Sequence, residues 1–322
     1  MLGYLHTAGE ALVFDTALPW VGELIAEGSA GELAQTCEWE PTVSVQIEAA
    51  RRPFDTRRWD FVTRGVWAHG GEVVVANACT SGFDLHLAVD DDRFRFTYRW
   101  RPPFRDRAAS RVLRSRFHLL ARAVLMQYPA LWVAATRGRV PLHASACVVG
   151  ARKTLLTAPS GVGRSTLLLQ AGAHETSGDN LAVGDGTTVW GLVEPMRVEG
   201  AGGRRMPHGR NEAAVDGRVD SLVPDALVVL SRRQGRESAI ASCSSLDAAR
   251  SLVTSTYMAG ELRRYWVFAA ALSAATVIGP PHPPIADVAS AFAARLSCYV
   301  LELGSDAAAT LATLGRPTEV AA

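Results

Sequence analysis

The amino-acid sequence predicts a β-rich N-terminal domain followed by an α/β domain. Between residues 41 and 99 apolar and polar side chains alternate with period two, which is typical of half-buried β-strands. From residue 108 onward the apolar spacing becomes helical, and segments with strand and helix character then alternate around a glycine-rich turn at residues 158–163. These observations divide the chain into residues 1–107 and 108–322.

The N-terminal domain is expected to be a meander of antiparallel hairpins. The stretches 43–47 and 94–98 both alternate apolar residues with polar neighbours. "GVWAHGGEVVVAN" places a Gly-Gly turn between two β-rich runs, and "LHLAVDDDRFRFTY" places an acidic turn between two more. The proline pair in "RPPF" at 101–104 then ends the sheet.

A helix over residues 108–127 is expected to bridge the two domains, because its apolar residues fall near one face with arginines opposite. The second domain then begins with a strand at 140–149, a tight turn at 150–152 and a strand at 153–157. The stretch 200–220 has weak periodicity and many glycines, and it is predicted to be a mobile loop. Further patterns predict strands at 187–193, 226–231 and 298–303, and helices at 245–259, 283–296 and 306–315.

The composition narrows the function classes. With 48% hydrophobic and 20% charged residues and a formal net charge of +1, the chain is predicted to fold and not to bind nucleic acid through gross charge. Its five cysteines are widely spaced without a C-x-x-C pair, which argues against a disulfide framework and a zinc site. The longest apolar run, 266–279, is too short to cross a bilayer, and the start lacks a signal-peptide pattern. We therefore expect a cytoplasmic protein without a membrane partner.

The segment "APSGVGRSTLLL" at 158–169 is close to the phosphate-binding pattern G-x-x-x-x-G-K-[ST] between a strand and a helix. Glycines in such a loop let backbone N–H groups turn toward phosphate oxygens, and the hydroxyl at the Ser165 position ligates Mg²⁺. Ala158 replaces the first glycine, and Arg164 replaces the lysine, which keeps the charge but changes its geometry. A glycine turn without any ligand is the alternative. The residues predicted to bind nucleotide are Ser160, Gly161, Val162, Gly163, Arg164, Ser165 and Thr166.

Two further segments carry residues suited to phosphoryl transfer, which needs a phosphate cradle, a metal and a carboxylate near the attacking hydroxyl. In "SGDNLAV", Asp179 is the candidate base or Mg²⁺ ligand, and Asn180 can add an amide oxygen to the metal. An Asp-Asn turn in which Asp179 only caps the backbone is the alternative. His143, in the strand before the loop strand, is expected to face the phosphates, although a structural histidine fits there too.

Two groups of arginines remain without a fixed role. Arg204 and Arg205, with Arg210, lie in the glycine-rich stretch and could close over the terminal phosphate or hold an acidic acceptor, or form a solvated loop. The arginines of the stretch 93–107 form a basic stripe with interleaved aromatic residues. Because the chain is nearly neutral overall, a solvated sheet face or a dock for an acidic peptide fits this stripe better than nucleic acid does.

Three segments in one order resemble a known family, the catalytic domain of HPr kinase/phosphorylase and the smaller HPr-kinase-like proteins. They are "LHASACVV" at 142–149, "APSGVGRST" at 158–166 and "SGDNLAV" at 177–183. The ending "LSCYVLELGSDAAATLATL" is similar to the final strand and helix of the smaller members, so the resemblance covers about residues 108–322. Arg164 and Asn180 depart from the family pattern. The residues that match it are His143, Ser160, Gly161, Gly163, Ser165 and Asp179.

The resemblance implies an α/β P-loop kinase domain that uses ATP and Mg²⁺ to phosphorylate a hydroxyl of a peptide, protein or small metabolite. Some smaller members are associated with tailoring of ribosomally made peptides, and residues 1–107 would then recognise the acceptor. Asp179, His143 and Arg164 would be catalytic, and Ser165, Asp179 and Asn180 would hold the metal. The competing hypothesis is a degenerate, non-catalytic nucleotide-binding scaffold, because Arg164 and Asn180 each weaken a charge that transfer needs. Assembly into a homo-oligomer stays open.

Overall fold

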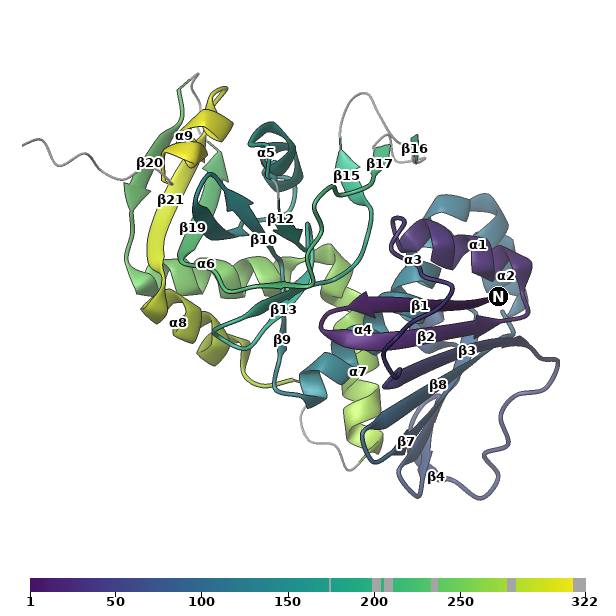
Figure 1. The fold of residues 1–322 in the computed structure, drawn as a ribbon. Coiled ribbons are helices and arrows are strands. Elements are labelled where there is room, and N and C mark those ends of the chain that lie inside the picture. The colour runs from purple at the N-terminus through teal and green to yellow at the C-terminus, as the bar shows by residue number, and fades with distance from the viewer. Residues whose placement is uncertain (174, 199–203, 206–210, 233–236, 277–281, 315–322) are drawn as a thin grey trace, which may run out of the picture.

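The computed structural model describes residues 1–173, 175–198, 204–205, 211–232, 237–276 and 282–314. An eight-stranded sheet and a six-stranded sheet form the centres of two lobes that lie side by side (Figure 1). Two small sheets of four and three strands complete the described β-structure. The protein is therefore a mixed α/β structure with several sheets.

The eight-stranded sheet has the strand order β1-β2-β3-β8-β7-β6-β5-β4. The antiparallel meander from β4 to β8 confirms the predicted hairpins, with Gly70 and Gly71 at positive φ in the turn between β5 and β6. The strands are β1 (Leu2–Thr7), β2 (Glu10–Thr16), β3 (Val43–Ala49), β4 (Asp60–Thr63), β5 (Val66–His69), β6 (Glu72–Val75), β7 (Phe83–Asp90) and β8 (Arg93–Trp100).

The prediction that all these strands are antiparallel is wrong for β3, which runs parallel to both β2 and β8. The chain leaves β2, forms helix α1 (Pro19–Gly28) and returns through residues 29–42 to begin β3 in the same direction. Such a crossover through a helix produces parallel neighbours. Period-two alternation marks a strand but carries no information about its direction.

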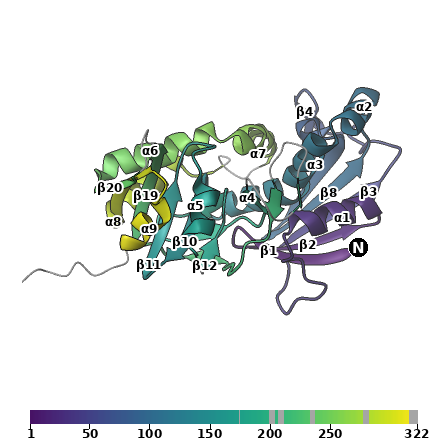
Figure 2. The ribbon, with the colours of Figure 1, turned by 90° about the horizontal axis from the view of Figure 1, so that it is seen from above.

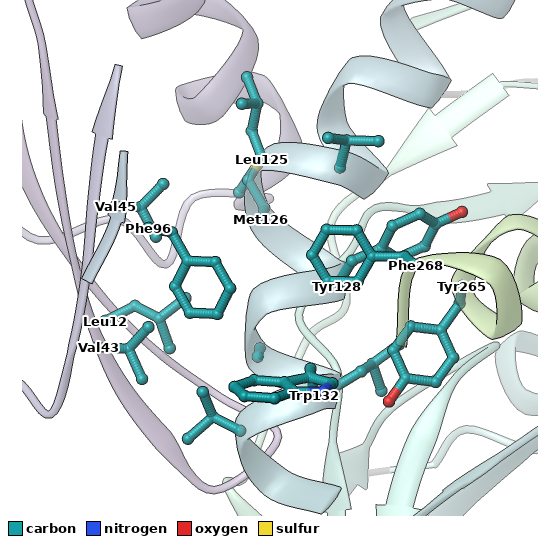
Figure 3. Close-up of a cluster of buried hydrophobic side chains, with 14 of the residues drawn as sticks. Leu12, Val43, Val45, Phe96, Leu125, Met126, Tyr128, Trp132, Tyr265 and Phe268 are labelled. Carbon is teal, nitrogen blue, oxygen red and sulfur yellow. The ribbon is translucent and has the colours of Figure 1, made fainter. Parts of the chain in front are cut away.

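Helices cover one face of this sheet, and their contact with it forms the largest apolar core (Figure 3). Trp132 is fully buried and meets the rings of Phe94 and Phe96 edge-on, at centroid distances of 5.8 and 6.2 Å. Tyr128, from the same helix, stacks near Tyr265 and Phe268. The covering elements are α1, α3 (Arg114–Arg122), the π-turn η2 (Ala123–Gln127), α4 (Tyr128–Thr136) and α7 (Arg263–Ala275).

The predicted helix at 108–127 is interrupted. Helix α2 (Phe104–Val112) ends before Leu113, whose φ of −109° and ψ of 45° are not helical, and α3, η2 and α4 continue to Thr136. These later segments pack on the N-terminal sheet, so residues beyond the predicted division at 107 and 108 contribute to the first core. The division itself stays a prediction. Among the described residues one helical run, Arg114–Thr136, is long and apolar enough to cross a membrane, and 72% of its apolar window is buried inside the protein.

The six-stranded sheet has the order β12-β10-β11-β19-β21-β20, with β11, β19 and β21 parallel. Helices α6 and α8 pack on one face, while α5 and α9 pack on the other (Figure 1). The strands predicted at 153–157, 187–193, 226–231 and 298–303 are confirmed, and so are the helices predicted at 245–259, 283–296 and 306–315. Some of their ends differ by a few residues. The elements are β10 (Ala144–Val149), β11 (Arg152–Thr157), β12 (Glu175–Ser177), β19 (Ala226–Arg232), β20 (Ala239–Ser242), β21 (Ser297–Leu303), α5 (Arg164–Gln170), α6 (Ser245–Met258), the short turn η3 (Gly260–Leu262), α8 (Ile285–Arg295) and α9 (Ala307–Thr313).

The two small sheets lie between the larger ones. The strand predicted at 140–149 divides at His143, because β9 (Val140–Leu142) joins the four-stranded sheet and β10 joins the six-stranded one. The loop predicted at 200–220 is wrong for residues 204–205 and 211–213, which form strands, while 200–203 and 206–210 lie outside the described residues. The small-sheet strands are β9, β13 (Ala182–Gly184), β14 (Val189–Gly191), β18 (Ser221–Leu222), β15 (Met196–Val198), β16 (Arg204–Arg205) and β17 (Asn211–Ala213). The remaining short turn is η1 (Ala78–Thr80).

Candidate functional site

The glycine loop leaves the carboxyl end of β11 and enters α5 at Arg164. Gly161 and Gly163 have φ angles of 81° and 119°, which other residues rarely adopt. A Cβ added to Gly161 would meet no atom within 4 Å, so the loop faces open space there. This is the strand, loop and helix arrangement that the sequence predicts for a phosphate site.

A pocket of about 380 Å³ opens beside this loop. It brings together every predicted site residue except the two arginines of the glycine-rich stretch: the loop 160–166, His143, Asp179 and Asn180 all line it. Arg204 and Arg205 form β16, and their side chains lie outside what the structure describes. Four further charged residues line the pocket, and we call them its wall: Glu194, Arg197, Arg232 and Glu261.

Ser165 and Asp179 meet at the floor of the pocket. The Ser165 hydroxyl donates a hydrogen bond of 3.0 Å to Oδ2 of Asp179. Asp179 is buried in the turn between β12 and β13, and burial raises its pKa against the lowering effect of Arg164. Its other oxygen, Oδ1, is buried and has no hydrogen-bond partner among the described residues. An unpaired buried carboxylate oxygen beside a hydroxyl fits the oxygen ligands that Mg²⁺ prefers.

Few other described side chains can complete the coordination of a metal ion at this position. Within the described part of the chain, no group of three or more His, Cys, Asp or Glu side chains is arranged to hold a metal ion. The predicted third ligand, Asn180, already uses its Oδ1, which lies 3.2 Å from both Nε2 of His143 and Nη2 of Arg164. A Mg²⁺ ion held by Ser165 and Asp179 would therefore take its remaining ligands from phosphate oxygens and water.

Arg164 turns inward from the loop and is only 7% exposed. Its guanidinium donates to three backbone carbonyl oxygens, from Nη1 to His143 at 2.9 Å, from Nη2 to Asn180 at 2.9 Å and from Nε to Asp179 at 3.2 Å. A buried guanidinium needs such acceptors, because its unpaired donors would be costly. This geometry favours a structural role for Arg164, in contrast to the predicted grip on phosphate.

His143 lies at the break between β9 and β10 and is buried. Burial, aided by the Arg164 charge, lowers its pKa to about 4, so the imidazole is neutral at pH 7. Because Asn180 offers its amide oxygen to Nε2, that nitrogen carries the proton, and Nδ1 is the free acceptor. Nδ1 is buried and has no partner among the described residues. Nδ1 can therefore accept a hydrogen bond, while the lowered pKa makes it a weak base.

The wall holds charged groups that are not among the predicted site residues. Arg197 donates to Glu261 at 3.1 Å and lies 3.8 Å from Glu194. Burial raises the pKa of Glu194 to about 7, against the lowering effect of Arg197. Arg232 donates from Nη2 to the carbonyl oxygen of Gly161 at 2.6 Å.

A sequence signal existed for one of these residues. Arg232 is the last residue of β19, the parallel neighbour of β11, and carboxyl ends of parallel strands meet at one edge of a sheet. Glu261 gives no comparable signal, because it comes from the short turn η3 before α7, far along the chain from the loop. Asp185, the next carboxylate along the chain after Asp179, is not part of the pocket lining and accepts hydrogen bonds from the backbone N–H groups of Thr187 and Thr188 in an exposed turn.

Comparisons with known proteins give little further information. No family model and no curated protein matches the chain. Among solved structures, the HPr(Ser) kinase/phosphatase from Coxiella burnetii is similar to 32% of this chain and to 77% of its own length, with 14% identity and a TM-score of 0.23. This weak likeness hints at the family that the three sequence segments resemble, but such a TM-score does not establish a shared fold.

Proposed function

We propose that the protein binds ATP with Mg²⁺ at the glycine loop and transfers the terminal phosphoryl group to a hydroxyl of a peptide, protein or small metabolite. One observation carries the proposal. The glycine loop opens on a pocket at whose floor the Ser165 hydroxyl and the buried Asp179 carboxylate lie 3.0 Å apart. Loop amides, a metal-ligating hydroxyl and a carboxylate are the parts that phosphoryl transfer needs.

Each residue has a role in this proposal. Ser165 and Oδ1 of Asp179 would hold Mg²⁺, which neutralises phosphate charge when bound. In its alternative role as base, the Asp179 carboxylate accepts the proton of the acceptor hydroxyl as the hydroxyl oxygen bonds to the terminal phosphorus and the bond to the ADP oxygen breaks. Burial supports this role because it raises the pKa of Asp179 and makes the carboxylate a better base. Neutral His143 lines the same pocket, but its lowered pKa makes it a weaker base than an exposed imidazole.

Arg197 and Arg232 are the cations that we assign to the phosphates. The Arg164 guanidinium already donates to carbonyl oxygens, so it has little to offer a ligand. Arg197 is about one quarter exposed and can exchange its contact with Glu261 for a phosphate oxygen. Arg232, already bonded to Gly161, stands at the mouth of the loop.

The test begins with the parent protein. Calorimetric titration with ATP should give binding that strengthens when Mg²⁺ is added, and γ-labelled ATP should label an acceptor among the products of neighbouring genes. Asp179→Asn should leave ATP binding within a few-fold of the parent and lower transfer by ~10²-fold or more, the scale of losing a general base. The matched control is Asp216→Asn, which changes an exposed carboxylate outside the pocket and should not alter transfer.

Two results would contradict the proposal. Absence of ATP binding at millimolar concentration would remove its basis, and an Asp179→Asn variant that labels the acceptor as fast as the parent would refute the assigned base.

A non-catalytic nucleotide-binding scaffold is the second candidate, favoured by the inward turn of Arg164 and by the amide at position 180. This candidate predicts ATP binding without labelling of any acceptor. It also predicts that Asp179→Asn leaves the activity of a partner enzyme unchanged, because the nucleotide is held chiefly by the loop backbone.

A further inference from the structure

Helix α2 carries apolar side chains on its outer side. Phe104 is 88% exposed and Val112 is 81% exposed. With 100° per residue, these two side chains and exposed Ala108 fall on one stripe of the helix. A helix on a folded protein usually turns such a stripe toward the core.

Five arginines flank this stripe, and they differ from the other arginines of the basic stretch. Arg93, Arg99 and Arg101 pair with Glu40, Glu48 and Asp84 on or beside the sheet. Over 104–116 the single acidic residue, Asp106, accepts a hydrogen bond from Asn77 at 2.7 Å. We call the exposed surface of α2 and the start of α3 the arginine face. None of its five guanidinium groups forms an ion pair or hydrogen bond with a described residue: Arg105, Arg107, Arg111, Arg114 and Arg116.

We propose that the arginine face docks an acidic segment of another polypeptide that presents apolar side chains to Phe104 and Val112. Unpaired arginines favour carboxylates, which they bind in a bidentate manner. Exposed apolar side chains gain free energy when a partner covers them. Arginines and exposed apolar side chains together fit a segment that has one apolar side with acidic residues at its margins.

A second copy of the chain fits this face poorly. In a two-fold symmetric contact the same surface meets itself, so five unpaired arginines would face five others. Like charges opposed across an interface disfavour association. The partner is therefore a different, acidic surface.

The face lies away from the pocket. In both ribbon views α2 is at the end of the molecule farthest from α8 and α9, and the loop before α5 lies in the lobe of the six-stranded sheet (Figures 1 and 2). The docked segment is thus separate from the reacting hydroxyl. This inference does not depend on phosphoryl transfer, and its test needs neither ATP nor an acceptor.

The test measures fluorescence anisotropy of a labelled synthetic peptide of glutamate and leucine, ordered so that the leucines share one side of a helix. At low salt the parent should bind this peptide, and binding should weaken as salt screens the charges. The double variant Arg107→Glu/Arg111→Glu should bind about tenfold or more weakly, and Phe104→Ser should weaken binding by a smaller factor, about threefold. All three positions are exposed, so these variants should fold like the parent, which circular dichroism checks.

The matched control is Arg95→Glu, which reverses an exposed arginine on β8 that forms no ion pair with a described residue and lies outside the arginine face. It should bind within about twofold of the parent. Equal binding by the parent and the double variant would overturn the proposal, as would failure of the parent to bind at low salt. Binding of phosphatidylglycerol vesicles in place of the peptide would assign the face to lipid and overturn it too.

Discussion

The arginines on the floor and on the wall of the pocket differ in their exposure and in the groups that they contact. On the floor, Arg164 is 7% exposed, and three carbonyl oxygens engage its guanidinium. On the wall, the Arg197 side chain is 25% exposed, and among the described residues it pairs with two carboxylates, at 3.1 and 3.8 Å. The availability of an arginine to a ligand therefore depends on what its guanidinium already binds, and not on its position in a motif.

The largest expected effect tests the floor. Arg164→Ala removes the donor that three buried carbonyls share, and each buried acceptor left without a partner costs about 1–3 kcal/mol. We expect the free energy of unfolding to fall by about 4 kcal/mol, measured by urea denaturation. Arg164→Lys should also destabilise the fold, because an ammonium group cannot reproduce the planar fork.

The control for this comparison is Arg232→Ala, which removes an exposed arginine that bonds one carbonyl of the same loop. Its cost should stay below about 1 kcal/mol. If Arg164→Lys is as stable as the parent and binds ATP more tightly, Arg164 acts as the motif lysine does. The proposed difference between the floor and wall arginines is then wrong.

The sequence predicted a large part of this floor. The order of strand, glycine loop and helix located Gly161, Gly163 and Ser165, and the spacing to "SGDN" brought Asp179 to the same pocket. The direction of the Arg164 side chain could not be predicted, because its acceptors come from two other segments whose positions depend on the tertiary fold. For the same reason Glu261 was missed.

The prediction of the fold has the same limit, because it too depends on tertiary contacts. Period-two patterns identified β3 and β8 as strands, but only the crossover through α1 determines that they are parallel. No individual strand or helix was predicted within the first 40 residues, which form β1, β2 and α1. Exposure is equally a tertiary property: Arg101 and Arg105 belong to one basic stretch, yet only Arg101 pairs with a carboxylate.

The next effect concerns the pH dependence of stability, for which Glu194 and His143 have opposite signs. Burial raises the pKa of Glu194 to about 7, above its unfolded value near 4.5. The stabilisation from protonated Glu194 is therefore complete below pH 4.5 and is lost as the pH rises toward 7. His143 has a pKa lowered to about 4 from 6.5, so its contribution is complete above pH 6.5 and is lost as the pH falls toward 4. In the parent the two trends partly cancel.

Single variants should separate the two trends. Relative to the parent, Glu194→Gln should gain stability as the pH rises from about 4.5 to 7, and His143→Gln should gain stability as the pH falls from about 6.5 to 4. Each difference should reach on the order of 3 kcal/mol, since one pKa unit corresponds to about 1.4 kcal/mol. Urea denaturation across this pH range measures both. Parallel stability curves for parent and variants would show that neither group changes its protonation on unfolding.

The smallest expected effect tests whether Arg197, which we assign to the phosphates, contacts the terminal phosphate. ATP and ADP differ by that phosphate alone, so a cation that grips it should favour ATP. Arg197→Gln should therefore weaken ATP binding about tenfold more than ADP binding, which corresponds to about 1.4 kcal/mol for one charge-assisted contact. Arg152→Gln, at the far end of β11, is the control and should leave both affinities unchanged. Calorimetric titration of both nucleotides measures the ratio without an acceptor. If the parent binds neither nucleotide, the proposed function fails as a whole; if the parent prefers ATP and Arg197→Gln keeps the same preference, only the role of Arg197 is refuted.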